Sequence, residues 1–400
     1  MRARGILFLI LMGVYFAAAR PGQAQAATVV TDLGVAYTFG QQITFRASVQ
    51  SESPIEEVRV FFQSPEMPNA LSGVARLDES GLAVYQHDLS TAAVRAFSEV
   101  AYWFAVTLEG GQVFTSERFS FLYQDSRFEW QTLTGEPFRV HWYQGNAAFA
   151  QLILDTAQRG LREAVTILDA ARPEQVDIYV YANPDDYALA RDLLQPDWVG
   201  GHTDPAAGVI VVPLLPGEEQ RLEVERKIPH EVAHIVLYQY AGSGYANLPT
   251  WLNEGFASRM ELNPNPDYLF LIQTAQQNQS LLPISSLCDP FPRDASGAVL
   301  AYAESTSFVR YLERAYGPAG IRALVRSYSQ GASCENGPRA APFDTSLSQL
   351  EQEWRSATFS ETTVQITLEP LVPWLVLAVV VLAGPLIAAV VFWVGSRGNV

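Results

Sequence analysis

Two of the five histidines in this 400-residue chain lie four positions apart in the segment HEVAH, with Glu231 directly after His230 and before His234. On a helix, positions i and i+4 share one face, so both imidazoles can bind the same metal ion. Glu231 is rotated by about 100° from His230 and can take a proton from a water held by that ion. A chance match to HExxH is on the order of a few per thousand chains of this composition. The segment therefore predicts a zinc hydrolase site.

A catalytic zinc normally takes three protein ligands and leaves one coordination position open. Glu254 lies twenty positions after His234, in the segment LPTWLNEGFASRMEL. Pro249 and Thr250 predict a helix start, which places Glu254 in the first turns of that helix, able to face both histidines. Two histidines and a glutamate form an established catalytic zinc set. We therefore predict one Zn²⁺ per chain.

HEVAH followed by WLNEGFA resembles the gluzincin metallopeptidases, the group that includes thermolysin and the zinc aminopeptidases. The stretch from about Phe138 to Trp354 is similar to the peptidase MA-like domains of exported bacterial proteins. The resemblance implies a zincin-like fold and a polypeptide substrate. It also implies that His230, His234 and Glu254 bind zinc, with the glutamate after the first histidine as general base.

The same resemblance implies a role for Tyr302, in the segment AYAESTSFVRYLE. This segment is similar to the aminopeptidase segment in which a tyrosine hydroxyl stabilises the oxyanion. The alternative is an aromatic side chain that only packs at a helix start.

The chain departs from the aminopeptidases in one motif. It lacks the Gly-x-Met-Glu-Asn sequence whose glutamate binds the amino end of a substrate. Residues 208–213 instead predict a strand, and as an edge strand it would pair with an extended substrate backbone. These two features favour an endopeptidase.

The N-terminus has the features of a secretory signal peptide. Arg2 and Arg4 precede an apolar run from residue 6 to 19, and Ala24-Gln25-Ala26 is a small-x-small cleavage site. We expect residues 1–26 to be removed. The alternative is an uncleaved N-terminal anchor.

An uncharged apolar segment lies near the C-terminus, at residues 371–394. At about 1.5 Å per residue a helix of this length crosses a hydrocarbon core of about 30 Å. We therefore expect a single transmembrane helix with a short cytoplasmic tail, residues 395–400. This topology predicts a single-pass protein of the cell membrane with an extracytoplasmic catalytic domain.

Cys288 and Cys334 are the two cysteines of the chain, and both lie in the part expected to be exported. Disulfides persist in such compartments, and two cysteines allow one pairing. We predict a possible Cys288–Cys334 disulfide, with two free buried thiols as the alternative. Neither cysteine lies in a CxxC motif or beside a histidine, so neither is expected to bind metal.

The remaining sequence divides into two patterns. Residues 27–130 contain short alternating stretches such as Ile43–Val49, which predict an all-β, immunoglobulin-like sandwich. Residues 131–360 contain strands first, as at 176–181, and helical spacing later, which predicts an α+β domain. The formal net charge of −16, without a basic stripe, excludes nucleic acid as a partner.

Together these features predict an exported, membrane-anchored zinc metallopeptidase. Two alternatives stay open. One is a zinc domain without catalysis that serves as a binding or adhesion module at the cell surface, and the other is a hydrolase of another amide of the cell envelope.

Overall fold

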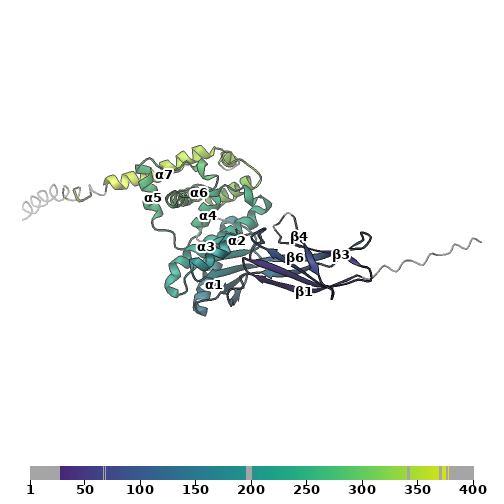
Figure 1. Cartoon of the computed structure of the whole chain (residues 1–400). Coiled ribbons are helices and arrows are strands. Elements are labelled where there is room, and N and C mark those ends of the chain that lie inside the picture. The colour runs from purple at the N-terminus through teal and green to yellow at the C-terminus, as the bar shows by residue number, and fades with distance from the viewer. Residues whose placement is uncertain are drawn as a thin grey trace, which may run out of the picture. The chain divides into compact units, whose positions relative to one another are not determined.

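The computed structural model describes residues 28–65, 67, 69–194, 201–339, 343–368, 372–374 and 377. The chain divides into two compact units, one formed by Met1–Val94 with Glu99–Tyr123 and the other by Arg95–Ser98 with Gln124–Val400. The first unit consists of strands, and most of the helices belong to the second (Figure 1).

The first unit contains eight strands in one hydrogen-bonded path. They are β1 (Val29–Thr38), β2 (Gln42–Gln50), β3 (Ile55–Gln63), β4 (Leu71–Leu77), β5 (Leu82–Asp88), β6 (Ser98–Leu108), β7 (Val113–Thr115) and β8 (Phe119–Tyr123). Their order is β1-β2-β5-β4-β3-β6-β7, and β8 pairs with β6. Every second residue of β6 is buried, as the two-residue period of a strand with one core-facing side requires.

The predicted fold class is wrong as stated, because it includes a transmembrane helix that the described residues do not contain. In the first unit, β4 pairs with β3 through Leu71–Ala75 and then with β5 through Arg76 and Leu77. The strands therefore form one continuous path of pairing, an N-terminal β-sheet region in which β4 changes partners along its length, and the immunoglobulin-like topology stays a prediction.

The predicted transmembrane helix is also corrected. No helix among the described residues is long and apolar enough to cross a membrane. The last long helix that the structure describes, α7 (Leu347–Leu368), carries Glu351, Glu353 and Arg355, so it is not apolar. The expected span at 371–394 lies outside the described residues except for 372–374 and 377.

The second unit combines a five-stranded sheet with helices. Its strands are β9 (Gln131–Gly135), β10 (Phe138–Trp142), β11 (Val176–Tyr181), β12 (His202–Asp204) and β13 (Val209–Pro213). Its long helices are α1 (Ala147–Leu168), α2 (Pro184–Leu194), α3 (Arg221–Ala241), α4 (Thr250–Arg259), α5 (Tyr268–Gln277), α6 (Ala295–Ser329) and α7. Short 3-10 turns are η1 (Glu218–Gln220), η2 (Gly242–Asn247), η3 (Ile284–Leu287) and η4 (Gly337–Arg339).

The sheet of the second unit corrects the predicted edge strand. Its order is β12-β13-β11-β10-β9, with β10, β11 and β13 parallel and the two outer strands antiparallel. β13, the strand predicted at 208–213, is paired on both sides. The edge belongs to β12, three residues long, which sequence patterns alone did not reveal.

Helix α1 supports α3, the helix that carries HEVAH. Asn146 caps α1 by accepting a hydrogen bond from the backbone N–H of Phe149 at 2.9 Å. The helices meet where Gly160 faces Pro229, and a Cβ on Gly160 would lie 2.9 Å from the Pro229 Cβ. Only a residue without a side chain allows this close approach.

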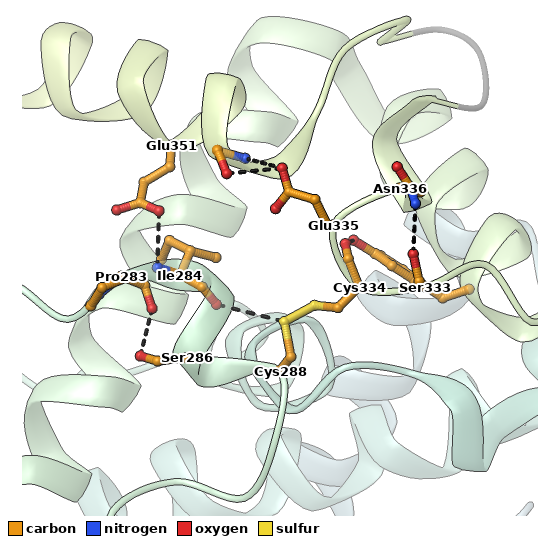
Figure 2. The surroundings of a disulfide bond; sticks show 11 residues. Pro283, Ile284, Ser286, Cys288, Ser333, Cys334, Glu335, Asn336 and Glu351 are labelled. Carbon is orange, nitrogen blue, oxygen red and sulfur yellow. Dashed lines mark hydrogen bonds between the residues drawn. A yellow bond between two sulfur atoms is a disulfide. The ribbon is translucent and has the colours of Figure 1, made fainter.

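A disulfide joins Cys288, after η3, to Cys334, before η4 (Figure 2). Glu351 of α7 accepts a hydrogen bond from the Ile284 N–H at 3.0 Å. The Cys288 carbonyl accepts another from the N–H of Thr250, the first residue of α4, at 3.1 Å. The disulfide and this hydrogen bond therefore fix the position of the first residue of α4, one turn before Glu254.

Candidate metal centre

Three side chains from α3 and α4 converge in the interior of the second unit. His230 and His234 lie one turn apart on α3, and Glu254 lies in the second turn of α4. Their ligand atoms all lie within 4.8 Å of one another. The distance is 3.4 Å from His230 Nε2 to Glu254 Oε2, and 3.9 Å from His234 Nε2 to Glu254 Oε1. The helical spacing and the packing of α4 on α3 thus bring the three predicted ligands together.

The Nδ1 atoms of both histidines face hydrogen-bond acceptors. His230 Nδ1 lies 3.3 Å from Glu261 Oε1, and His234 Nδ1 lies 3.1 Å from Asn253 Oδ1. Tyr245 donates a hydrogen bond to the same Asn253 oxygen at 3.2 Å. We assign the proton of each ring to Nδ1 on the basis of these partners. Each Nε2 then presents its lone pair to Glu254, which is the arrangement of metal-binding histidines.

The residues present fit a zinc ion. His230 Nε2 and Glu254 Oε2 are buried and have no hydrogen-bond partner among the described residues. Buried polar atoms without partners are costly, and here two electron-rich atoms face each other at 3.4 Å. A cation between them would satisfy both. Two imidazole nitrogens and a carboxylate are also a donor set that catalytic zinc uses.

The electrostatics of the site favour a positive charge. Burial lowers the pKa of His230, but the nearby carboxylates of Glu254 and Glu261 outweigh burial and raise that pKa to about 10. Burial raises the pKa of Glu254, yet His234 and His230 hold it below its ordinary value. The carboxylates around His230 therefore create a negative potential at the place where a metal ion would bind.

Glu231, the predicted general base, is buried and oriented by β12. The hydroxyl of Thr203 donates to Glu231 Oε2 at 2.6 Å. Gly201 lies against the same carboxylate, because an added Cβ would be 2.5 Å from Glu231 Oε1. The edge strand thus holds the glutamate in one orientation, a role that only the fold reveals.

A cavity of about 170 Å³ adjoins these residues. It is lined by Arg226, Lys227, His230, Glu231, Ser258, Glu261, Tyr268 and Tyr302. Burial and then Glu254 raise the pKa of Tyr302 well above its ordinary value, so its phenol stays protonated and can donate. Burial and then Glu261 raise the pKa of Tyr268, a second protonated phenol that the sequence analysis missed.

A proline in α3 helps to place Glu261. Pro229 has no N–H, so the carbonyl of Glu225, four residues earlier, lacks its helical partner. That carbonyl instead accepts hydrogen bonds from the N–H groups of Leu262 at 2.9 Å and Asn263 at 3.3 Å. The segment after α4 is thereby tied to α3, and Glu261 faces His230 from that segment.

The structure brings His230, His234, Glu254, Glu231 and Tyr302 to one place. Neither Cys288 nor Cys334 lines the cavity, and a backbone hydrogen bond connects Cys288 to the start of α4. Sequence reasoning missed Thr203 and Asn253. Asn253 directly precedes Glu254 in WLNEGFA and was visible there, whereas Thr203 carried no signal because its strand is so short.

No curated protein matches the chain. Similar solved structures include a family 56 carbohydrate-binding module, a β-1,3-glucan-binding domain, with 16% identity, a TM-score of 0.17, and coverage of 23% of this chain and 98% of that chain. OgpA from Akkermansia muciniphila has 17% identity and a TM-score of 0.21, and the match covers 25% of this chain and 28% of OgpA. The cycloalternan-degrading enzyme from Trueperella pyogenes has 20% identity, a TM-score of 0.16, and coverage of 20% and 10%. TM-scores this low give no information about fold or ligand.

A sequence profile described as the peptidase MA superfamily matches residues 156–360. The matched region contains the two histidines of HEVAH, Glu231, Glu254 and Tyr302. It spans just over half of the 400 residues and supports a peptidase-type enzyme. This chain therefore belongs to the peptidase MA superfamily.

Proposed function

We propose that this protein is an exported zinc metallopeptidase of the gluzincin type that cleaves peptide bonds within a chain. One observation carries the proposal: His230 Nε2 and Glu254 Oε2 are buried and face each other without hydrogen-bond partners in the described part of the chain, beside a glutamate that Thr203 orients. Proteins of this superfamily are generally zinc-dependent. The donor set would hold one Zn²⁺ per chain.

The residues around the site have complementary tasks in amide hydrolysis. Zinc, when bound, lowers the pKa of a coordinated water toward about 7 and polarises the substrate carbonyl. Glu231 would accept the proton of the attacking water and transfer it to the leaving nitrogen. Tyr302 would donate a hydrogen bond to the oxygen on which negative charge develops. Glu261 and Asn253 hold the two imidazoles in the orientation that metal binding needs.

The position of β12 supports cleavage within a chain. β12 is an edge strand, antiparallel to β13, and Thr203 links it directly to Glu231. Edge strands bind extended peptides through backbone hydrogen bonds. Such binding needs no free chain end beside the peptide bond that is cleaved. The chain also lacks the motif with which aminopeptidases hold a free amino end.

The disulfide supports export. Disulfides form and persist in oxidising compartments, and Cys288 and Cys334 are paired. The predicted signal peptide, residues 1–26, lies outside the described residues.

The test is a mixed peptide library incubated with the purified protein and read by mass spectrometry. Glu231→Gln is the control, and its zinc content is measured in parallel. Internal cuts made only by the wild type would support the proposal, and stepwise loss of N-terminal residues would contradict the endopeptidase assignment. Bound zinc without any cut by the wild type would favour a binding module or a hydrolase of another envelope amide.

A further inference from the structure

Arginines from three helices line two neighbouring cavities of the second unit. The arginines are Arg159 and Arg162 on α1, Arg259 on α4, and Arg310 and Arg314 on α6. The cavities have volumes of about 490 and 510 Å³ and share Arg259 and Glu313 in their walls. None of these residues lines the cavity beside the candidate metal centre.

The local charge is opposite to that of the whole chain. The only carboxylates that line the two cavities are Glu163 and Glu313, against five guanidinium groups. A third, Glu225, lies 3.7 Å from Arg159. The chain as a whole has a formal net charge of −16 and only 26 basic residues. An arginine concentration of this kind is not the ordinary solvated surface of an acidic protein.

Arg259 uses both of the lining carboxylates. Its Nε lies 2.6 Å from Glu313, and one Nη lies 3.0 Å from Glu163. These ion pairs fix the guanidinium where α1, α4 and α6 meet. Among the described residues, neither Arg310 nor Arg314 forms an ion pair with a carboxylate, whereas Arg259 forms two.

Arg310 has a side-chain hydrogen-bond donor without an acceptor. Its Nε is buried and has no hydrogen-bond partner among the described residues. Burial and the positive charges of Arg259 and Arg314 lower the pKa of its guanidinium, and they outweigh the opposing effect of Glu261 and Glu313. A buried donor without an acceptor is costly, so an anionic acceptor placed beside this Nε would be stabilised.

We propose that these cavities bind a phosphate-bearing ligand, with Arg310 and Arg314 as its principal contacts. Guanidinium groups bind phosphate oxygens through paired N–H donors, and a doubly charged oxyanion balances several arginines better than a single carboxylate does. The phosphate can be free or part of a lipid headgroup. This site does not depend on the proposed peptidase activity.

Isothermal titration calorimetry with inorganic pyrophosphate tests the site, on the full chain after removal of metal with a chelator. Removing the metal prevents capture of the probe at the zinc centre. We expect Arg310→Gln and Arg314→Gln each to weaken binding about tenfold. Arg326→Gln, in the part of α6 that follows the kink at Gly317 and outside both cavities, is the control and should leave binding unchanged. Binding should also weaken as NaCl is raised.

Arg314 is exposed, so its variant tests the proposal even if Arg310→Gln folds poorly. Equal affinity of the wild type and Arg314→Gln for the probe that binds, or no binding of either pyrophosphate or phosphatidic acid vesicles, would overturn the proposal. Vesicles of phosphatidylcholine with and without phosphatidic acid separate the two sources. Binding only to phosphatidic acid vesicles that is lost in Arg314→Gln identifies a lipid headgroup, and pyrophosphate binding without vesicle binding identifies a free phosphate.

Discussion

Two histidines of the second unit, the partly buried His141 and the buried His230, show how similar surroundings lead to different roles. His141 Nε2 lies 2.6 Å from Asp177 Oδ1, and its Nδ1 lies 3.0 Å from the Thr132 hydroxyl. Both ring nitrogens are satisfied. His230 has one nitrogen beside Glu261 and the other buried, facing Glu254 without a hydrogen bond.

The surroundings explain the difference. Asp177 also accepts two hydrogen bonds from Arg139, and Tyr179 stacks on the His141 ring, so that cluster is closed. Around His230, the ion pairs of Glu254 and Glu261 among the described residues are with histidines and none is with an arginine or lysine. A carboxylate beside a histidine therefore does not indicate a metal site by itself. An unsatisfied nitrogen that faces a second ligand atom does.

The largest expected effect is on peptide turnover, which should depend on the cluster around His230 and not on the cluster around His141. Glu231→Gln should lower peptide turnover by about 10³-fold, because the amide cannot accept the proton, while zinc content stays near one per chain. Peptide cleavage and zinc analysis measure the two quantities. Thr132→Val in the His141 cluster is the comparison variant and should leave turnover unchanged. If both variants lost peptide turnover equally, the two histidine clusters would not differ in function.

The second prediction concerns the support of His230. Glu261→Gln should weaken zinc binding about 10- to 100-fold, because the amide is a poorer acceptor for the His230 N–H. Competition with a zinc chelator measures the affinity. Unchanged affinity would mean that Glu261 does not orient the ligand. Glu313→Gln, on a helix outside the metal cavity, is the control for loss of a carboxylate.

The third prediction uses the closed cluster. Burial raises the pKa of Asp177, but His141 and Arg139 lower it by a larger amount, so the pKa of Asp177 lies below its ordinary value. A carboxyl group whose folded pKa is lowered stabilises the fold above its unfolded pKa of about 3.9, and the stabilisation is lost as pH falls through the folded pKa.

Asp177→Asn should therefore lower the free energy of unfolding at pH 7 by about 2 kcal/mol. This figure is less than the range for a fully buried pair because the Arg139 side chain is 41% exposed. Urea melts at pH 7 and pH 3 measure the effect, and the difference between variant and wild type should shrink at pH 3. A constant difference would contradict this electrostatic origin.

The smallest effect concerns the edge strand. Thr203→Val keeps the side-chain shape but removes the donor to Glu231, and we expect turnover to fall by up to about tenfold with zinc affinity unchanged. Steady-state kinetics on a single cleaved peptide measures it. A change in zinc affinity instead would show that β12 acts on the ligands and not on the base.

Much of the secondary structure was predictable because its signals are local. The strand predicted at 176–181 is β11 to the residue, and α4 begins at Thr250 as expected. The errors concern relations over longer distances. β13 was expected at an edge, but β12, which covers it, has three residues and no detectable alternation. The composition of 371–394 predicted a transmembrane helix, yet the described residues contain no helix able to span a membrane.

The sequence by itself determined which residues can act as ligands and base. His230, Glu231 and His234 lie on one helix, where a period of 3.6 residues converts spacing directly into direction. Tertiary structure alone decided which groups support them. Thr203 and Glu261 come from other segments, and their contacts depend on packing and on the carbonyl that Pro229 leaves unpaired. No local period links such segments, because separation along the chain does not determine distance across a folded core.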